Sequence, residues 1–188
     1  MNDGDQPELS KDAEDALRTC CAEKSSFITG GAGTGKTTLI RSILSTLERD
    51  GILCAVVAPT GVAALNVEGR TIHSLFRFPF GPIGKETIQK VWGERADTFK
   101  RIGAIIIDEV SMVRADVMDA IEQFLFLNGP RPGQLFGGVK IILVGDPYQL
   151  PPIVKDKTDR PWLNNRGYSS EYFFAAHSFP RCPSLVPV

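Results

Sequence analysis

The apolar residues of this chain follow two patterns that alternate along its length. Short, mainly apolar runs lie at 26–29, 53–58, 104–107 and 139–144, and the run at 53–58 is continuous. Between them, apolar positions recur every three or four residues, as at 35–49 and around 117–125. Continuous runs of this length are typical of strands buried on both faces, and the recurring spacing is typical of helices. The alternation predicts an α/β fold, with a parallel sheet and helices on both of its faces.

Weaker patterns predict shorter elements. A helix with Ser10 as its N-cap is expected before the first strand, and a short helix is expected at 61–67. A proline- and glycine-rich loop is expected at 77–84, followed by a mixed-charge and partly helical stretch at 85–101. Beyond 147 the apolar pattern weakens, and we expect only a short helix at 171–177 and a strand starting at 184–188.

Composition narrows the class of protein. Hydrophobic residues make up 43% and charged residues 23% of the 188 residues, which is ordinary for a globular protein. The net charge of −1 gives no overall signature of a nucleic-acid binder, although a local basic groove is compatible with it. The four cysteines, Cys20, Cys21, Cys54 and Cys182, lack the spacing of a zinc site, so we expect reduced thiols.

No targeting or membrane segment is expected. Residues 1–7 are polar and acidic, unlike a signal peptide, and no apolar run approaches the roughly 18 residues of a membrane span. We therefore expect a cytoplasmic protein, with the nucleoid as a possible workplace, or a nuclear or mitochondrial one in a eukaryote.

Loops after four of the predicted strands should share one edge of the sheet. They open at Gly30, Pro59, Asp108 and Gly145. Ligands of parallel α/β sheets bind at the carboxyl ends of the strands, so these loops should form one site.

A phosphate-binding loop follows the first strand. Residues Gly30, Gly31, Ala32, Gly33, Thr34, Gly35, Lys36 and Thr37 fit the P-loop pattern in full. Glycines let backbone N–H groups wrap a phosphate, and the next helix adds its positive end. Lys36 would contact the β- and γ-phosphates and Thr37 would bind Mg²⁺. A glycine-rich turn with a surface lysine is the alternative, which the flanking strand and helix disfavour.

Two further loops supply candidate catalytic groups. Asp108 ends a buried strand and can hold Mg²⁺, while Glu109 can deprotonate the attacking water. A plain strand end with solvated acids is the alternative reading. Gln149 follows the apolar run at 139–144 and would sense the γ-phosphate or hold the water; an exposed glutamine in a rigid proline turn is an equal alternative.

Four segments in order resemble motifs of superfamily 1 DNA helicases: FITGGAGTGKTTL at 27–39, APTGVAALNVEGRTIHSLF at 58–76, IIIDEVSMV at 105–113 and GDPYQLPPI at 145–153. The second is especially similar to the Pif helicases and their RecD-like relatives, the 5′-to-3′ branch. The resemblance implies a RecA-like P-loop NTPase fold and a motor that couples hydrolysis of Mg²⁺-bound ATP to movement along single-stranded DNA.

The resemblance also implies residue roles. The cofactor-binding set extends from Gly30 through Lys36 and Thr37 to Thr38, and Thr37 and Asp108 bind Mg²⁺. Lys36, Glu109 and Gln149 form the catalytic set. The residues implied to meet the DNA backbone are Pro59, Thr60, Gly61, Val62, Thr71, His73 and Ser74.

Physical chemistry supports part of the DNA assignment. Thr60 and Gly61 start a predicted helix and offer N–H groups and a hydroxyl to a phosphate. Phe76, Phe78 and Phe80 are able to stack on bases, although we expect at least two of them to pack under the loop instead. For His73, a core or capping role is as well supported as a DNA contact.

The chain departs from the family pattern in two places. Ala13 stands near the position where the family often carries an adenine-reading glutamine, so selectivity for ATP is inherited mainly from the resemblance. The family also has two RecA-like domains, and the second supplies arginines to the transition state. We expect residues 1–24 to form a helix leading into the motor, residues 25–188 to form the first RecA-like domain, and a longer, monomeric parent to carry the second in cis.

Two other hypotheses remain open from the sequence. As an isolated fragment, the chain would bind nucleotide and single-stranded DNA with negligible turnover, because those arginines are missing. Alternatively, the P-loop would belong to another class of ATPase, such as a clamp-loader-like machine that assembles into rings.

Overall fold

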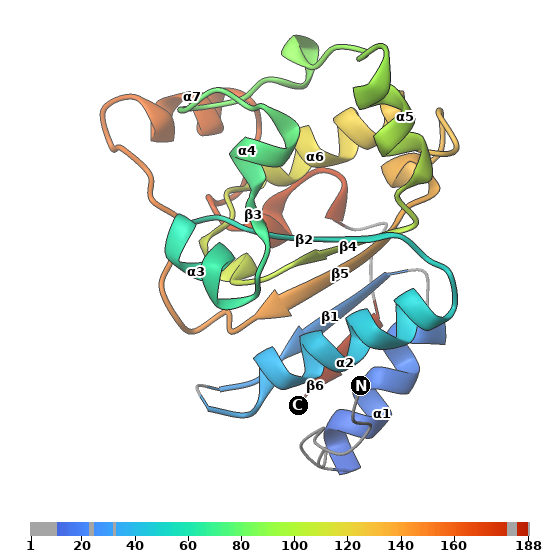
Figure 1. Ribbon diagram of the computed structural model, residues 1–188. Coiled ribbons are helices and arrows are strands. Elements are labelled where there is room, and N and C mark those ends of the chain that lie inside the picture. Colours follow the sequence, from blue (N-terminus) through green and yellow to red (C-terminus); the bar gives the residue numbers. More distant parts are fainter. Residues whose placement is uncertain (1–10, 23–24, 32, 180–183, 188) are drawn as a thin grey trace.

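The computed structural model describes residues 11–22, 25–31, 33–179 and 184–187. All six strands in this part of the chain are parallel and form one sheet in the order β3-β2-β4-β5-β1-β6 (Figure 1). The strands are β1 (Ser25–Thr29), β2 (Cys54–Ala58), β3 (Arg70–Thr71), β4 (Ala104–Ile107), β5 (Lys140–Gly145) and β6 (Ser184–Pro187). The predicted α/β class and the parallel sheet are confirmed.

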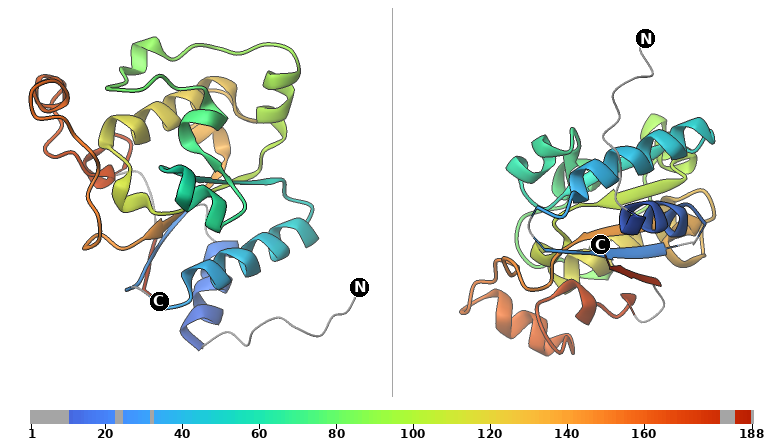
Figure 2. Two further views of the ribbon diagram at one scale, coloured as in Figure 1. Left: turned by 60° about the vertical axis from the view of Figure 1, so that its left-hand side comes forward. Right: turned by 90° about the horizontal axis from the view of Figure 1, so that it is seen from below.

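Helices cover both faces of this sheet. On one face, α1 (Lys11–Ala22) packs against α2 (Lys36–Arg49), as Figure 2 shows. The other face carries α4 (Ile72–Phe76), α5 (Glu94–Arg101), α6 (Ala115–Asn128) and α7 (Asp159–Asn165). The shorter elements are α3 (Gly61–Asn66) and the 3-10 turns η1 (Lys85–Thr87), η2 (Val110–Met112), η3 (Leu135–Gly138) and η4 (Phe173–Ala175).

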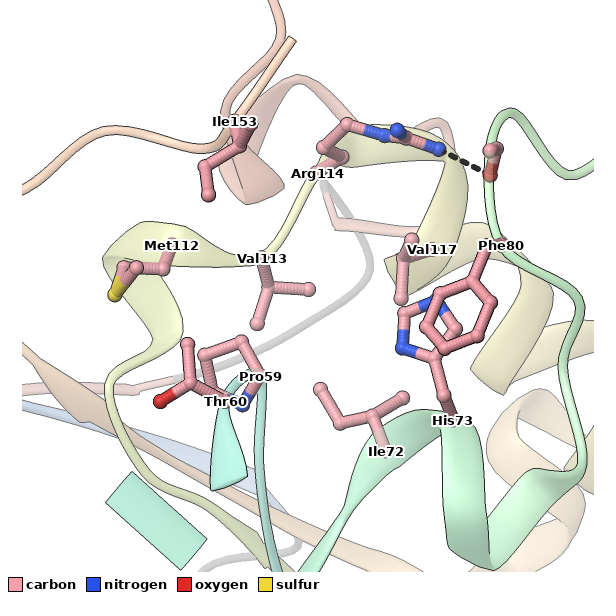
Figure 3. Close-up of a pocket in the computed structure, with 11 residues that line it drawn as sticks. Pro59, Thr60, Ile72, His73, Phe80, Met112, Val113, Arg114, Val117 and Ile153 are labelled. Carbon is pink, nitrogen blue, oxygen red and sulfur yellow. Dashed lines mark hydrogen bonds between the residues drawn. The ribbon is translucent and has the colours of Figure 1, made fainter. Parts of the chain in front are cut away.

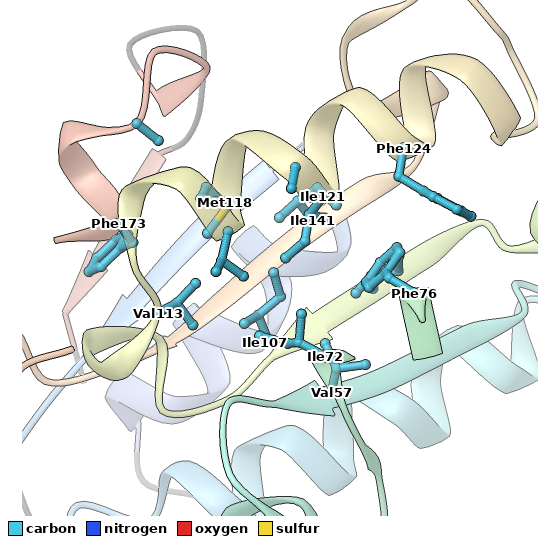
Figure 4. Close-up of a cluster of buried hydrophobic side chains, with 14 of the residues drawn as sticks. Val57, Ile72, Phe76, Ile107, Val113, Met118, Ile121, Phe124, Ile141 and Phe173 are labelled. Atoms are coloured by element: carbon cyan, nitrogen blue, oxygen red, sulfur yellow. The ribbon is translucent and has the colours of Figure 1, made fainter. Parts of the chain in front are cut away.

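The central strands divide their side chains between two hydrophobic clusters. Ile106 and Ile142 point to the α1 and α2 side, whereas Ile107 and Ile141 join the larger cluster under α6 (Figure 4). Alternate residues of a strand face opposite sides of its sheet, so a strand covered on both faces is apolar at most positions. This double burial explains the mainly apolar runs of the sequence.

Two local expectations differ from the structure. The predicted helix at 171–177 is only the turn η4, because the Asp119 carboxylate accepts the backbone N–H groups of His177 and Ser178 and holds this segment in a turn. The helix α7 lies where no element was expected. Pro161 lies in its first turn, where helical N–H groups have no intrahelical partner, so the proline does not break it.

Several other expectations are settled by the same structure. The short helix at 61–67 and the final strand are confirmed as α3 and β6. Ser10, the proposed N-cap of α1, lies outside the described residues. No described helix has the length and apolar character needed to cross a membrane.

Candidate functional site

The sheet brings the four predicted loops to one edge. In the parallel register Thr29 lies beside Gly145, and Ile107 lies between Val57 and Leu143. The segments that start at Gly30, Pro59, Asp108 and Gly145 therefore all leave the sheet at its carboxyl edge. This is the arrangement that the sequence predicted, and it is the usual ligand-binding edge of such sheets.

The P-loop joins β1 to α2. Gly33 and Gly35 have φ angles of +77° and +86°, a left-handed conformation that costs a glycine little, and α2 begins directly at Lys36. The Lys36 ammonium group donates to the carbonyls of Gly30 and Gly31, both at 2.7 Å. The cation is thus held over the loop whose N–H groups form the candidate phosphate cradle.

The remaining P-loop residues agree with this geometry. The Thr34 hydroxyl donates to the Gly31 carbonyl at 3.1 Å, and Thr37 and Thr38 lie in the first turn of α2. Ala32 lies outside the described residues. The structure therefore brings together a lysine, a hydroxyl and the start of a 14-residue helix.

Asp108 follows β4 and is almost completely buried, with 8% of its surface exposed. This burial raises the pKa of Asp108, and the neighbouring Glu109 charge raises it further. The backbone N–H of Glu109 and the nearby Lys36 charge act in the opposite direction. A buried carboxylate with too little charge compensation is suited to binding a cation.

Glu109 has a strained backbone. Its φ and ψ of +49° and +43° are left-handed, which costs a residue with a Cβ about 1–2 kcal/mol. The next residues form η2, where the Met112 N–H donates to the Glu109 carbonyl at 3.0 Å. Strain of this kind is concentrated at functional sites, where the surrounding structure maintains it.

Gly145 maintains that neighbouring turn, a role that sequence reasoning missed. A Cβ at Gly145 would lie 3.0 Å from the Val110 nitrogen and 3.1 Å from the Val110 Cγ1. A side chain at position 145 would therefore require η2 to shift by a few tenths of an ångström, which glycine avoids. The loop carrying Gln149 is therefore packed directly against the turn that follows Glu109.

Asp146 organises the Gln149 loop. Its carboxylate accepts the Tyr148 N–H at 3.0 Å and the Gln149 side-chain amide at 3.1 Å, while its carbonyl accepts the Gln149 N–H at 3.0 Å. An aspartate at the first position of a turn is a common signal, but here it also fixes the glutamine side chain. Gln149 is half-buried at the sheet edge and is not a freely exposed side chain.

The predicted DNA-contact residues lie after β2 and β3. The Thr60 and Thr71 side chains cap α3 and α4 by accepting the N–H groups of Ala63 and Ser74, at 3.2 and 3.1 Å. The other members are exposed, as Gly61, Val62 and Ser74 are, or half-buried, as Pro59 and His73 are.

The three phenylalanines separate as expected. Phe76 and Phe78 are buried and stack on each other at 5.2 Å, whereas Phe80 is 93% exposed. Phe80 lies against His73, with ring centroids 5.5 Å apart and planes 18° apart. Burial lowers the pKa of His73, and the nearby Arg114 charge lowers it further.

A cavity of about 250 Å³ opens beside these residues (Figure 3). Four chain segments line it: the turn after β2, the stretch from α4 to Gly81, the stretch from η2 into α6, and Ile153. Sequence reasoning did not predict this cavity, because its walls come from residues far apart in the chain.

Arg114 ties these segments together. Its guanidinium group donates to the Asp116 carboxylate at 2.9 and 2.8 Å, to Asp159 at 3.3 Å and to the Gly81 carbonyl at 2.6 Å. The Arg114 and Asp116 side chains are 11% and 0% exposed. No motif in the sequence marks Arg114, which follows the Asp108–Glu109 pair by a few residues. Only the folded structure identifies it as the centre of a buried ionic cluster.

Together, the fold and the edge define a P-loop domain of the RecA-like type. The profile of the family described as PIF1-like helicase matches residues 6–172. The chain belongs to the PIF1-like helicase family. This assignment confirms the resemblance to the 5′-to-3′ branch and does not favour the clamp-loader-like alternative.

Individual relatives agree with this assignment. The ATP-dependent DNA helicase PIF1 of Saccharomyces cerevisiae (strain YJM789) is 36% identical over 155 residues, 79% of this chain and 18% of that protein. The human PIF1 helicase is 34% identical over 185 residues, 97% of this chain and 26% of that protein. The chain thus spans about a quarter or less of these relatives.

Solved structures resemble the whole described fold. Bacteroides Pif1 bound to single-stranded DNA has a TM-score of 0.84 at 34% identity, covering 97% of this chain and 42% of that one. Bacteroides Pif1 in complex with ADP-AlF₃ and single-stranded DNA has a TM-score of 0.85 at 35% identity, covering 96% and 42%.

Proposed function

We propose that this chain is the ATP-binding motor domain of a 5′-to-3′ DNA helicase, which couples hydrolysis of Mg²⁺-bound ATP to translocation on single-stranded DNA. The observation that carries this proposal is the convergence of the P-loop, the Asp108–Glu109 pair and the Gln149 loop at one sheet edge. The nucleotide and DNA complexes of Bacteroides Pif1 support it.

The nucleotide half of this proposal assigns one role to each group. Residues 30–38 bind the phosphates, with Lys36 on the β- and γ-phosphates, through backbone N–H groups and the positive end of α2. Glu109, the residue after the buried Asp108, acts as the general base toward water from a left-handed backbone position. Gln149, held by Asp146, contacts the γ-phosphate or the water and relays the nucleotide state to η2 through Gly145.

Mg²⁺ fits the oxygen donors present. Asp108 and Thr37 would hold it together with phosphate oxygens, since Mg²⁺ in such sites takes one or two protein carboxylates and keeps the rest for substrate and water. An ion held there would neutralise part of the charge on the phosphates. The ion would add positive charge beside the buried Asp108, whose pKa is raised by burial despite the nearby Lys36 charge.

The DNA half is assigned to the segments at the carboxyl ends of β2 and β3, which are exposed or half-buried. Pro59, Thr60, Gly61, Val62, Thr71, His73 and Ser74 would meet the backbone of the single strand. The parent protein would act as a monomer with a second RecA-like domain in cis. Its cellular location would be that of its DNA substrate: the nucleoid, the nucleus or the mitochondrion. That domain would supply arginines worth about 10³–10⁵ in rate.

ATP hydrolysis by the full-length parent, with and without single-stranded DNA, tests the proposal. We expect stimulation by DNA, abolished by Lys36→Ala and retained by Arg41→Ala, which removes an exposed cation from the same helix. Activity that survives Lys36→Ala would contradict the nucleotide site, and activity indifferent to DNA would contradict the motor. The isolated chain should bind nucleotide with negligible turnover.

A further inference from the structure

Two loops at the sheet edge carry the groups that act on water in the proposed reaction. Glu109 lies directly before η2, and Gln149 lies in the loop that follows β5. Gly145, at the end of β5, packs against η2, since a Cβ placed on it would lie 3.0 Å from the Val110 nitrogen. The general base and the glutamine therefore act from two loops in direct contact. What the glutamine does there depends on which atom of its amide group it offers.

Three hydrogen bonds to Asp146 hold Gln149 and its loop. The Asp146 carbonyl accepts the Gln149 backbone N–H at 3.0 Å. One carboxylate oxygen accepts the Tyr148 N–H at 3.0 Å, and the other accepts the Nε2 group of Gln149 at 3.1 Å. One residue thus restrains both the backbone and the side chain of Gln149.

The bond to the side chain determines the orientation of the Gln149 amide. An ionised carboxylate only accepts hydrogen bonds, so the NH₂ group of the amide faces Asp146 and the amide oxygen does not. Oε1 then points away from Asp146 and is the atom available to the reactants. An oxygen in that position accepts a hydrogen bond from water, whereas it would repel the oxygens of a γ-phosphate.

We propose that Asp146 is a positioning residue, which orients the Gln149 amide so that Oε1 accepts a hydrogen bond from the attacking water. The inference rests on the proposed function and deepens it, because it selects water over the γ-phosphate as the contact of Gln149. The water donates one hydrogen to Gln149 and the other to Glu109, which directs a lone pair at the γ-phosphorus. As the new oxygen–phosphorus bond forms, the bond to the β–γ bridging oxygen breaks, ADP keeps that electron pair, and Glu109 takes the proton.

A purely structural turn does not account for the contact with the Gln149 side chain. An aspartate that stabilises a turn needs one side-chain oxygen, here the one bonded to the Tyr148 N–H, and asparagine supplies that oxygen equally well. The second carboxylate oxygen is not needed for the turn and is bonded to Gln149. Asp146→Asn therefore keeps the turn and changes only the group that faces Gln149, from an acceptor to a donor.

Reversing the polarity of this pair tests the inference. In Asp146→Asn, two NH₂ groups would face each other, so the Gln149 amide turns over and offers the water a donor. In Gln149→Glu, two carboxylates face each other. The double variant again sets one donor against one acceptor, keeps the net charge, and leaves a carboxylate oxygen at position 149 for the water.

Single-turnover hydrolysis of ATP by the full-length parent, at saturating single-stranded DNA, measures the effect. We expect each single change to slow hydrolysis by about 10- to 100-fold with little change in the Kd of ATP, and the double variant to recover most of the loss. Asp156→Asn makes the same substitution at an exposed ion pair with Arg160 and should leave the rate unchanged. Recovery in the double variant also separates an effect of polarity from a loss of folding, which a second substitution would not reverse.

Each contrary result has its own meaning. A double variant whose loss is the product of the two single losses overturns the inference, because Gln149 would then act as a donor to the γ-phosphate. An Asp146→Asn protein with the unaltered rate also overturns it, since the turn alone would then be sufficient. Absence of hydrolysis by the unaltered parent, measured before any substitution, overturns the proposed function itself.

Discussion

The carboxyl edge of the sheet has two halves that are built differently. The phosphate half consists of the P-loop, Asp108, Glu109 and the Gln149 loop, and each part is a short contiguous stretch after a central strand. The cavity half, around His73, Phe80 and Arg114, is held by long-range contacts: Arg114 reaches Gly81 and Asp159 across 33 and 45 residues. Local backbone geometry thus sets the phosphate half, and a buried ionic cluster sets the cavity half.

Removing Arg114 should separate the two halves most strongly. Arg114→Ala leaves Asp116 and Asp159 without their shared cation, and breaking a buried pair in this way costs about 3–5 kcal/mol. Urea denaturation measures the loss. Arg160→Ala, which removes a half-exposed cation paired with Asp156 and Glu171, should cost less than about 1 kcal/mol. Equal effects of the two changes would contradict the central role given to Arg114.

Gly145→Ala tests the contact between the two catalytic loops. The added methyl would press on Val110, so we expect a loss of about 1–3 kcal/mol and a fall in ATP hydrolysis by the full-length protein. Gly61→Ala, where a Cβ meets no atom within 4 Å, is the matched control for stability. A stable and fully active Gly145→Ala protein would show that the close approach to η2 is dispensable.

Glu109→Gly should stabilise the fold while abolishing hydrolysis. Glycine removes the left-handed strain of about 1–2 kcal/mol but adds chain entropy, which leaves a net gain of up to about 1 kcal/mol. Glu109→Gln removes the base and keeps the strain, so it should lose activity without this gain. Thermal unfolding distinguishes the two variants, and equal melting temperatures would argue against stored strain.

Replacing Asp108 should have the smallest effect on stability, and this effect should depend on pH. Because its pKa is raised in the folded state, the protonated form is the one that favours folding, and this contribution is lost as the pH rises through the folded pKa. Without nucleotide or Mg²⁺, Asp108→Asn should therefore gain in melting temperature over the unaltered protein as the pH rises from 4 to 7. A difference that is independent of pH would contradict the burial of a charged carboxylate.

The same contrast explains what the sequence could predict. Strands β1, β2, β4 and β5 were foreseeable because burial on both faces makes them mainly apolar, and the P-loop because its glycines and lysine are close together in the sequence. Helix α7 was missed because its stability comes from tertiary contacts, namely Leu163 in the core and Asp159 on Arg114. The cavity was missed for the same reason.

In the segment that contains Phe76, Phe78 and Phe80, the sequence predicts the type of residue and the tertiary structure decides which of the rings is exposed. Residues 76, 78 and 80 alternate along the chain, and nothing local distinguishes them. The structure buries Phe76 and Phe78 against Phe124 and leaves Phe80 on the cavity rim. One ring out of three is thus free to meet a base, which only the packing around α6 decides.

Calorimetric binding of ATP to the chain is the most direct test of the central claim that this sheet edge is a nucleotide site. The account predicts binding that requires Mg²⁺, that is lost in Lys36→Ala and weakened in Asp108→Asn, and that persists in Phe80→Ala, because Phe80 belongs to the cavity half. Binding of equal strength in the unaltered chain and in Lys36→Ala would contradict the account.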